Sequence, residues 1–118
     1  MVKHVQRPWG SFCQYTHNED STVKVLTVKA GARTSLQSHN LRKELWVALD
    51  EGLLVQIKDT IVDFNKGSSL LIDIGQKHRI TCKGPKEARI LEISFGDFRE
   101  EDIVRHEDDY GRQAVIPP

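Results

Sequence analysis

Cysteine is scarce in this chain, and no hydrophobic run approaches the roughly 18 apolar residues that a membrane span requires. Cys13 and Cys82 are the only two cysteines, and their spacing fits neither a metal motif nor a disulfide framework. Both thiols are therefore expected to be reduced and buried. The N-terminal residues 1–7 contain no apolar segment of the kind that a secretion signal needs. We expect a cytoplasmic protein without membrane contact.

An excess of charge of either sign is also lacking. The 17 basic and 17 acidic residues cancel, so the formal net charge is zero. This balance argues against a nucleic-acid partner, which usually requires a strongly basic surface. A length of 118 residues predicts a single domain over residues 1–118, with one modest hydrophobic core.

Short strands are predicted along most of the chain, because the segments between turns are brief and rich in β-branched residues. The expected strands cover residues 12–15, 23–29, 34–39, 45–49, 53–58, 69–73, 79–82 and 90–95. Turn sequences such as Asp50-Glu51-Gly52 separate them, and this spacing favours a β-sandwich or barrel. One short C-terminal helix is predicted over residues 98–105, which carry acidic residues ahead of an apolar pair.

The most informative segment places Gln37, His39 and Glu44 close together in the sequence, and His78 follows later. Residues two apart on a strand point to the same face, so Gln37 and His39 are expected to lie side by side. One amide, two imidazoles and one carboxylate that converge would bind a divalent metal and leave coordination positions open, as catalytic sites do. The alternative is that Gln37 and His39 lie on a solvent-exposed face.

The strand predicted over residues 34–39 has one polar face, formed by Ser35, Gln37 and His39. If this face points into a barrel, the barrel has a polar lining, which is costly unless it binds something. The strand predicted over residues 45–49 is apolar on both faces, and we expect it to be packed on both sides.

The spacing of these residues resembles the two sequence motifs of the cupins. In the first motif, Gly31 is followed by Gln37, His39 and Glu44, with Gln37 in the place of the usual first histidine. In the second, residues 67–78 run from a glycine to His78. The resemblance implies a double-stranded β-helix, also called a jelly-roll barrel.

Within the cupins, the chain is similar to the C-terminal domain of type II mannose-6-phosphate isomerases, which is often fused to a mannose-1-phosphate guanylyltransferase. The similar segments are residues 7–10, 26–33, 35–37, 44–47, 102–105 and 107–112. The resemblance implies a homodimer that binds a sugar phosphate. It also implies one divalent ion (Zn, Mn, Co, Ni or Fe) held by Gln37, His39, Glu44 and His78, since such ligands accept any of these metals.

Three positions depart from the family pattern. The family typically has histidines where this chain has Leu41 and Leu45, and a glutamine where it has Ser94. Neither histidine position is expected to be a metal ligand, so the ligand set is retained. The two missing histidines would flank the site, and their absence raises the question of whether a proton carrier is lost.

The resemblance implies that the chain interconverts mannose 6-phosphate and fructose 6-phosphate through an enediol. Arg42 matches a basic position beside the ligands and is the catalytic candidate, because a guanidinium suits a phosphate or an enediolate. Lys77 is a further candidate for substrate binding. Arg105 and Arg112 either approach the barrel mouth as substrate-binding residues or pin the C-terminal tail through nearby acids.

Two other functions stay open. The chain fits a binding module that recognises a sugar phosphate or sugar nucleotide without converting it, and the leucines at positions 41 and 45 favour this alternative. It also fits a different metal-dependent cupin enzyme acting on another small hydroxylated substrate.

Overall fold

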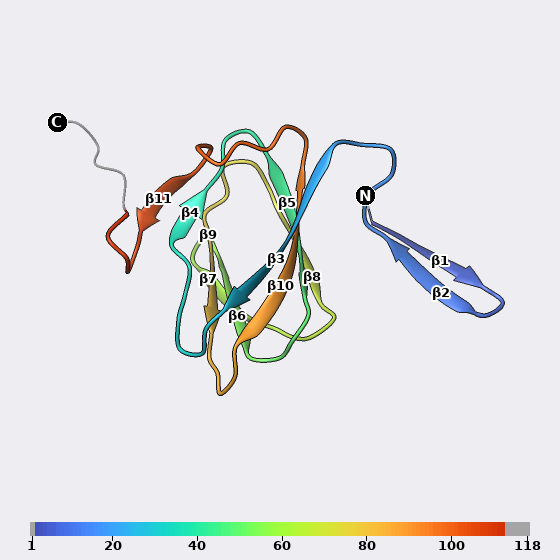
Figure 1. Ribbon diagram of the computed structural model, residues 1–118, viewed down its shortest axis with the longest axis horizontal. Coiled ribbons are helices and arrows are strands. Elements are labelled where there is room, and N and C mark those ends of the chain that lie inside the picture. The colour runs from blue at the N-terminus through green and yellow to red at the C-terminus, as the bar shows by residue number, and fades with distance from the viewer. Residues whose placement is uncertain (1, 113–118) are drawn as a thin grey trace.

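The computed structural model describes residues 2–112, and Figure 1 shows that they form strands around a flattened barrel. Its strands are β1 (Lys3–Arg7), β2 (Gly10–Gln14), β3 (Ser21–Val28), β4 (Leu36–Ser38), β5 (Lys43–Ala48), β6 (Leu53–Ile57), β7 (Thr60–Phe64), β8 (Ser69–Ile72), β9 (His78–Cys82), β10 (Ala88–Phe95) and β11 (Val104–Glu107). Within these residues there is no helix, and hence none that would cross a membrane.

Two antiparallel sheets face one another and enclose the core. One sheet has the order β3-β10-β5-β8, and the other has the order β11-β4-β9-β6-β7. The chain passes between the sheets as it runs from β3 to β4 and from β4 to β5, which is the winding of a double-stranded β-helix. The β1–β2 hairpin belongs to neither sheet and stands away from the barrel (Figure 1).

The alternation of side chains along β5 explains how this strand is buried on both faces. Trp46 and Ala48 point into the core, while Leu45 and Val47 lie on the outer face of the sheet, and all four are buried. The expectation of a strand packed on both sides is therefore confirmed. Glu44 shares the inner face with Trp46, so the same alternation brings a carboxylate into the barrel.

All eight strands expected from the sequence are present, with shifted ends. The largest change is at residues 34–39, where only β4 (Leu36–Ser38) is a strand. Thr34 is bonded to Ile80 instead, through its backbone N–H and through its hydroxyl. Strands β1, β7 and β11 were not anticipated, because each is mostly polar or solvent-exposed and lacks a buried apolar face.

The helix predicted over residues 98–105 is wrong. Turns occupy its first part, where the N–H of Asp102 donates to the carbonyl of Arg99, and β11 begins at Val104. Eight residues are too few for a stable helix without strong tertiary support. Here the competing contacts win, because the Asp102 carboxylate accepts the backbone N–H groups of Asn40 and Leu41 and β11 pairs with β4.

Candidate functional site

A buried cluster of His39, Glu44 and His78 lies inside the barrel. One possible ligand atom from each residue lies within 4.8 Å of the others, and all three side chains are at most 2% exposed. His39 follows β4, Glu44 is in β5 and His78 begins β9, so both sheets contribute. The structure therefore brings together three of the four ligands expected from the sequence.

Both imidazoles are oriented by backbone carbonyls. Nδ1–H of His39 donates to the carbonyl of Asp102 at 2.6 Å, and Nδ1–H of His78 donates to the carbonyl of Gln76 at 2.8 Å. Because a carbonyl can only accept, each ring carries its proton on Nδ1 and keeps a lone pair on Nε2. This is the tautomer in which a histidine binds a metal through Nε2.

The two Nε2 atoms face the same oxygen of Glu44. Oε1 of Glu44 lies 2.7 Å from Nε2 of His39 and 3.8 Å from Nε2 of His78. These contacts lack hydrogen-bond geometry, and within residues 2–112 Oε1 of Glu44 and Nε2 of His78 have no hydrogen-bond partner. Buried lone pairs directed at one another are costly, and a cation among them would satisfy Glu44 Oε1 and His78 Nε2. Nε2 of His39 also accepts a hydrogen bond of 3.4 Å from Nη2 of Arg42.

Burial of His78 and the contacts of Glu44 keep these two side chains in their metal-binding forms at neutral pH. Burial lowers the pKa of His78 from 6.5 to about 4, because the imidazolium would lose its hydration. Burial alone would raise the pKa of Glu44, but its contacts with His39, His78 and Arg42 outweigh this effect and lower the pKa. The result is a neutral imidazole beside an ionised carboxylate, which is what a divalent ion requires.

Gln37, the fourth expected ligand, lies beside the cluster on β4. Its Cα pairs with that of His78 across the β4–β9 ladder. Its side-chain Oε1 accepts a hydrogen bond of 2.8 Å from the hydroxyl of Ser35. Ser35, Gln37 and His39 all line the same cavity, so the polar barrel lining expected from this strand is confirmed. A role for Gln37 as a ligand stays a prediction.

Asp102 and Arg42 build the wall behind His39. Besides orienting His39, Asp102 fixes the loop after β4 by accepting the N–H groups of Asn40 and Leu41 at 2.9 and 3.0 Å. Arg42 is 7% exposed, donates to the carbonyls of Arg99 and Asp102, and stacks over the ring of Phe98. Sequence reasoning assigned no role to Asp102, because a carboxylate that bonds to backbone N–H groups leaves no sequence pattern.

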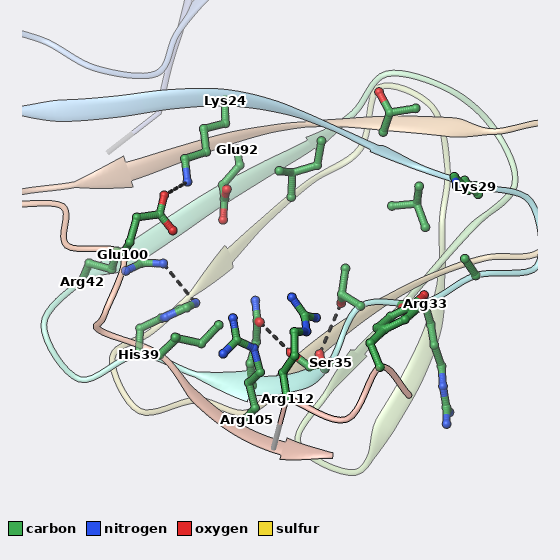
Figure 2. Close-up of a pocket in the computed structure, with 18 residues that line it drawn as sticks. Lys24, Lys29, Arg33, Ser35, His39, Arg42, Glu92, Glu100, Arg105 and Arg112 are labelled. Atoms are coloured by element: carbon green, nitrogen blue, oxygen red, sulfur yellow. Dashed lines mark hydrogen bonds and ion pairs between the residues drawn. The ribbon is translucent and has the colours of Figure 1, made fainter. Parts of the chain in front are cut away.

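A cavity of about 580 Å³ opens onto His39 and Gln37. Figure 2 shows that β3 and β10 form one of its walls, while β4 and β11 form the other. Lys24 and Glu100 form an ion pair of 2.9 Å at its edge. The cavity is therefore a pocket that leads from solvent to the buried cluster.

Three of the four basic residues singled out in the sequence line this pocket. These three are Arg42, Arg105 and Arg112. Lys77 is exposed and does not line the pocket. Arg112 is paired with Asp108 at 2.9 Å. Arg105 lies opposite Gln37 in the β11–β4 ladder, and its buried Nε has no hydrogen-bond partner among the described residues. Arg105 therefore has donors left over for a ligand.

Glu92, which the sequence reasoning passed over, also lines the pocket. It lies on the inner face of β10 and is 6% exposed. Figure 2 shows its carboxylate directed into the cavity, opposite the wall that carries His39. A signal for it exists in the sequence, since Glu92 is the one acid of residues 88–95 and lies between Leu91 and Ile93.

Two of the three positions that depart from the family pattern lie outside the cluster. The side chain of Leu41 is 62% exposed, and Leu45 is on the opposite face of β5 from Glu44. A histidine at either position would point away from the ligands in this backbone arrangement. Ser94 is different, because it is buried on the inner face and its Cα pairs with that of Glu44.

A double-stranded β-helix whose first and second motifs deliver His39, Glu44 and His78 to one point is a cupin. The family model "Mannose-6-phosphate isomerase C-terminal" matches residues 1–108, and the chain belongs to this family. A cupin protein from Bacteroides fragilis has the same fold, with a TM-score of 0.59 and 18% identity over 70% of this chain and 74% of that chain.

Curated relatives are similar over nearly all of this chain. It is 35% identical over 111 residues to the xanthan biosynthesis protein XanB of Xanthomonas campestris pv. campestris (strain B100), covering 93% of this chain and 24% of the relative. It is 38% identical over 111 residues to the alginate biosynthesis protein AlgA of Pseudomonas aeruginosa (strain PAO1), covering 93% and 23%. The chain thus spans about a quarter of the length of the relatives that it matches.

Proposed function

We propose that this protein is a metal-dependent aldose–ketose isomerase that interconverts mannose 6-phosphate and fructose 6-phosphate. The observation that carries the proposal is the cluster of His39, Glu44 and His78, which is buried yet adjoins an open pocket. Membership of the family described as "Mannose-6-phosphate isomerase C-terminal" supports the choice of reaction.

The donor set fits a divalent cation. Two Nε2 atoms and one carboxylate oxygen converge, and Glu44 Oε1 and His78 Nε2 have no hydrogen-bond partner among the described residues. Gln37 pairs in register with His78. Three protein ligands, or four with Gln37, leave a coordination position open, as catalytic ions require. When bound, the ion polarises the carbonyl and hydroxyl oxygens of the sugar and stabilises the negative charge of the enediolate.

The pocket residues of this chain would bind and orient the sugar phosphate. Arg105 is the strongest candidate for the phosphate, because it lines the cavity and its side chain forms no hydrogen bond or ion pair with the described residues, whereas Arg42 donates to two carbonyls. A guanidinium forms bidentate, charge-assisted hydrogen bonds to phosphate oxygens. Arg42 is held nearer to the cluster, 3.8 Å from Glu44 Oε1, where its charge would stabilise an anionic sugar oxygen.

The proposal is tested by incubating the protein with mannose 6-phosphate and Zn, Mn, Co, Ni or Fe(II) in turn, and measuring fructose 6-phosphate. Conversion above a metal-only blank supports it. Arg105→Gln should raise KM by about 10-fold or more with little change in metal content, since one charge-assisted contact is worth about 1.5–3 kcal/mol. Lys77→Gln is the matched control, because Lys77 is exposed and does not line the pocket.

A non-catalytic binding module is the alternative. It would show saturable binding of mannose 6-phosphate or GDP-mannose, weakened by Arg105→Gln, without conversion under any metal. Neither leucine that had favoured this alternative contacts the cluster, since Leu41 is exposed and Leu45 is on the outer sheet face. Absence of both binding and conversion would refute the isomerase and the binding module together.

A further inference from the structure

Isomerisation needs a group that carries a proton between the two carbons of the sugar, and we propose that Glu92 is this group. The inference rests on the proposed isomerase function. His39, Glu44 and His78 form the metal cluster, the Gln37 amide is not a base, and Glu100, another carboxylate of the pocket, is paired with Lys24. The arginines of the pocket are already protonated at neutral pH.

The carboxylate of Glu92 faces the pocket and is not paired. The residue is 6% exposed, and it forms no hydrogen bond or ion pair with any residue in the range 2–112. The cation nearest to it in register is Lys24, its Cα partner across the β10–β3 ladder. Lys24 does not neutralise Glu92, because its Nζ is 2.9 Å from Glu100 and lies over the ring of Phe98.

An unpaired acid that lines a pocket next to a ligand cluster is a candidate for a functional group. On its other side, Glu92 pairs in register with Trp46, whose indole N–H is directed at Glu44. Neither register neighbour of Glu92 is bonded to its carboxylate.

The position of Glu92 relative to the cluster suits a base. Ser94 pairs in register with Glu44, and Glu92 is two residues further along the same inner face of β10. Two residues advance a strand by about 7 Å, so Glu92 is too far along the sheet to join the three ligands. A sugar bound between them would meet the cluster through its oxygens and Glu92 through its carbons.

In the proposed step, the Glu92 carboxylate removes the proton from C2 of the aldose. The electrons of the C2–H bond form the C1=C2 double bond, and the carbonyl electron pair moves onto O1. The hydroxyl proton passes from O2 to O1, C2 becomes the carbonyl carbon, and Glu92 returns its proton to C1. Atoms and charge balance without an oxidant or a further reactant.

The test compares wild-type protein with Glu92→Gln, which keeps the shape of the side chain and cannot carry the proton. We expect Glu92→Gln to lower kcat by about 100-fold or more, the usual contribution of a general base. Metal content and the Kd of mannose 6-phosphate should stay within about three-fold of wild type. Solvent deuterium incorporation at C1 of the product should fall in parallel. Glu101→Gln, an exposed change of the same kind, is the control.

The outcomes separate this inference from the function on which it rests. If wild-type protein does not convert the sugar with any metal, the proposed isomerase function is overturned, and the role of Glu92 as its base is overturned with it. Wild-type conversion that Glu92→Gln retains overturns the role of Glu92 alone. Loss of metal or of sugar-phosphate binding in Glu92→Gln also overturns it, because the residue would then be structural.

Discussion

The buried imidazole of His78 should make the metal-free protein less stable as the pH falls below 6.5. Burial lowers the pKa of His78 from 6.5 to about 4, so the unfolded chain takes up a proton in a range where the folded protein does not. Protonation then favours the unfolded state. Stability from this group is complete above pH 6.5 and is lost progressively between pH 6.5 and about 4.

The size of the stability loss follows from the lowered pKa of His78. The loss relative to pH 7.5 should be about 2 kcal/mol at pH 5 and about 3 kcal/mol at pH 4, since each pKa unit corresponds to about 1.4 kcal/mol. Glu44 contributes little above pH 5. Its pKa lies below its usual 4.5, so its stabilising charge is lost only at lower pH.

Urea unfolding with EDTA at pH 7.5, 6, 5 and 4.5 measures the free energy of unfolding. His78→Gln is the reference, because an amide keeps a donor for the Gln76 carbonyl and does not titrate. The free-energy difference between wild type and variant should change by about 2 kcal/mol between pH 7.5 and 5. Parallel pH profiles for the two proteins would refute the buried, neutral state of His78.

Other predictions concern the residues around the ligands. Asp102→Ala should lower metal affinity by about 10–100-fold, because it frees the loop after β4 and the carbonyl that orients His39. A competition titration with a metal-sensitive dye measures this affinity. Leu45→His should destabilise the protein by about 2–3 kcal/mol in urea yet keep its metal affinity, since position 45 is buried on the outer face. Leu41→Ala should change stability by less than about 0.5 kcal/mol, because the side chain is 62% exposed. A large effect of Leu41→Ala or Leu45→His on metal affinity would contradict the placement of these side chains.

The barrel and most of its ligand cluster could be predicted because the responsible signals are local. Apolar alternation and turn residues mark β5 and β10, and the short spacing between His39 and Glu44 keeps the end of β4 close to the start of β5 in the opposite sheet. The prediction of a helix over residues 98–105 was wrong, because acidic residues ahead of an apolar pair fit the start of a helix as well as they fit the turn and strand found here. Only the long-range pairing of β11 with β4 decides the conformation there.

The surroundings of the cluster depend on contacts that sequence spacing does not record. The carbonyl of Asp102 orients His39 from 63 positions away, and Lys24 reaches Glu100 across 76 positions. Glu92 becomes a candidate only when the β10–β3 ladder shows that its neighbour Lys24 is engaged elsewhere. Lys77 is an example of sequence proximity without spatial proximity. It is next to His78 in the sequence but does not line the pocket.

Metal analysis of the purified protein tests the central claim most directly. Protein prepared without chelators should contain about one divalent ion per chain, and the His39→Ala/His78→Ala double variant should contain none, because two of the three converging ligands are removed. The Cys13→Ala variant, changed in the remote hairpin, should keep its ion. Full retention of the ion by the double variant would contradict the assignment of this cluster as the metal centre.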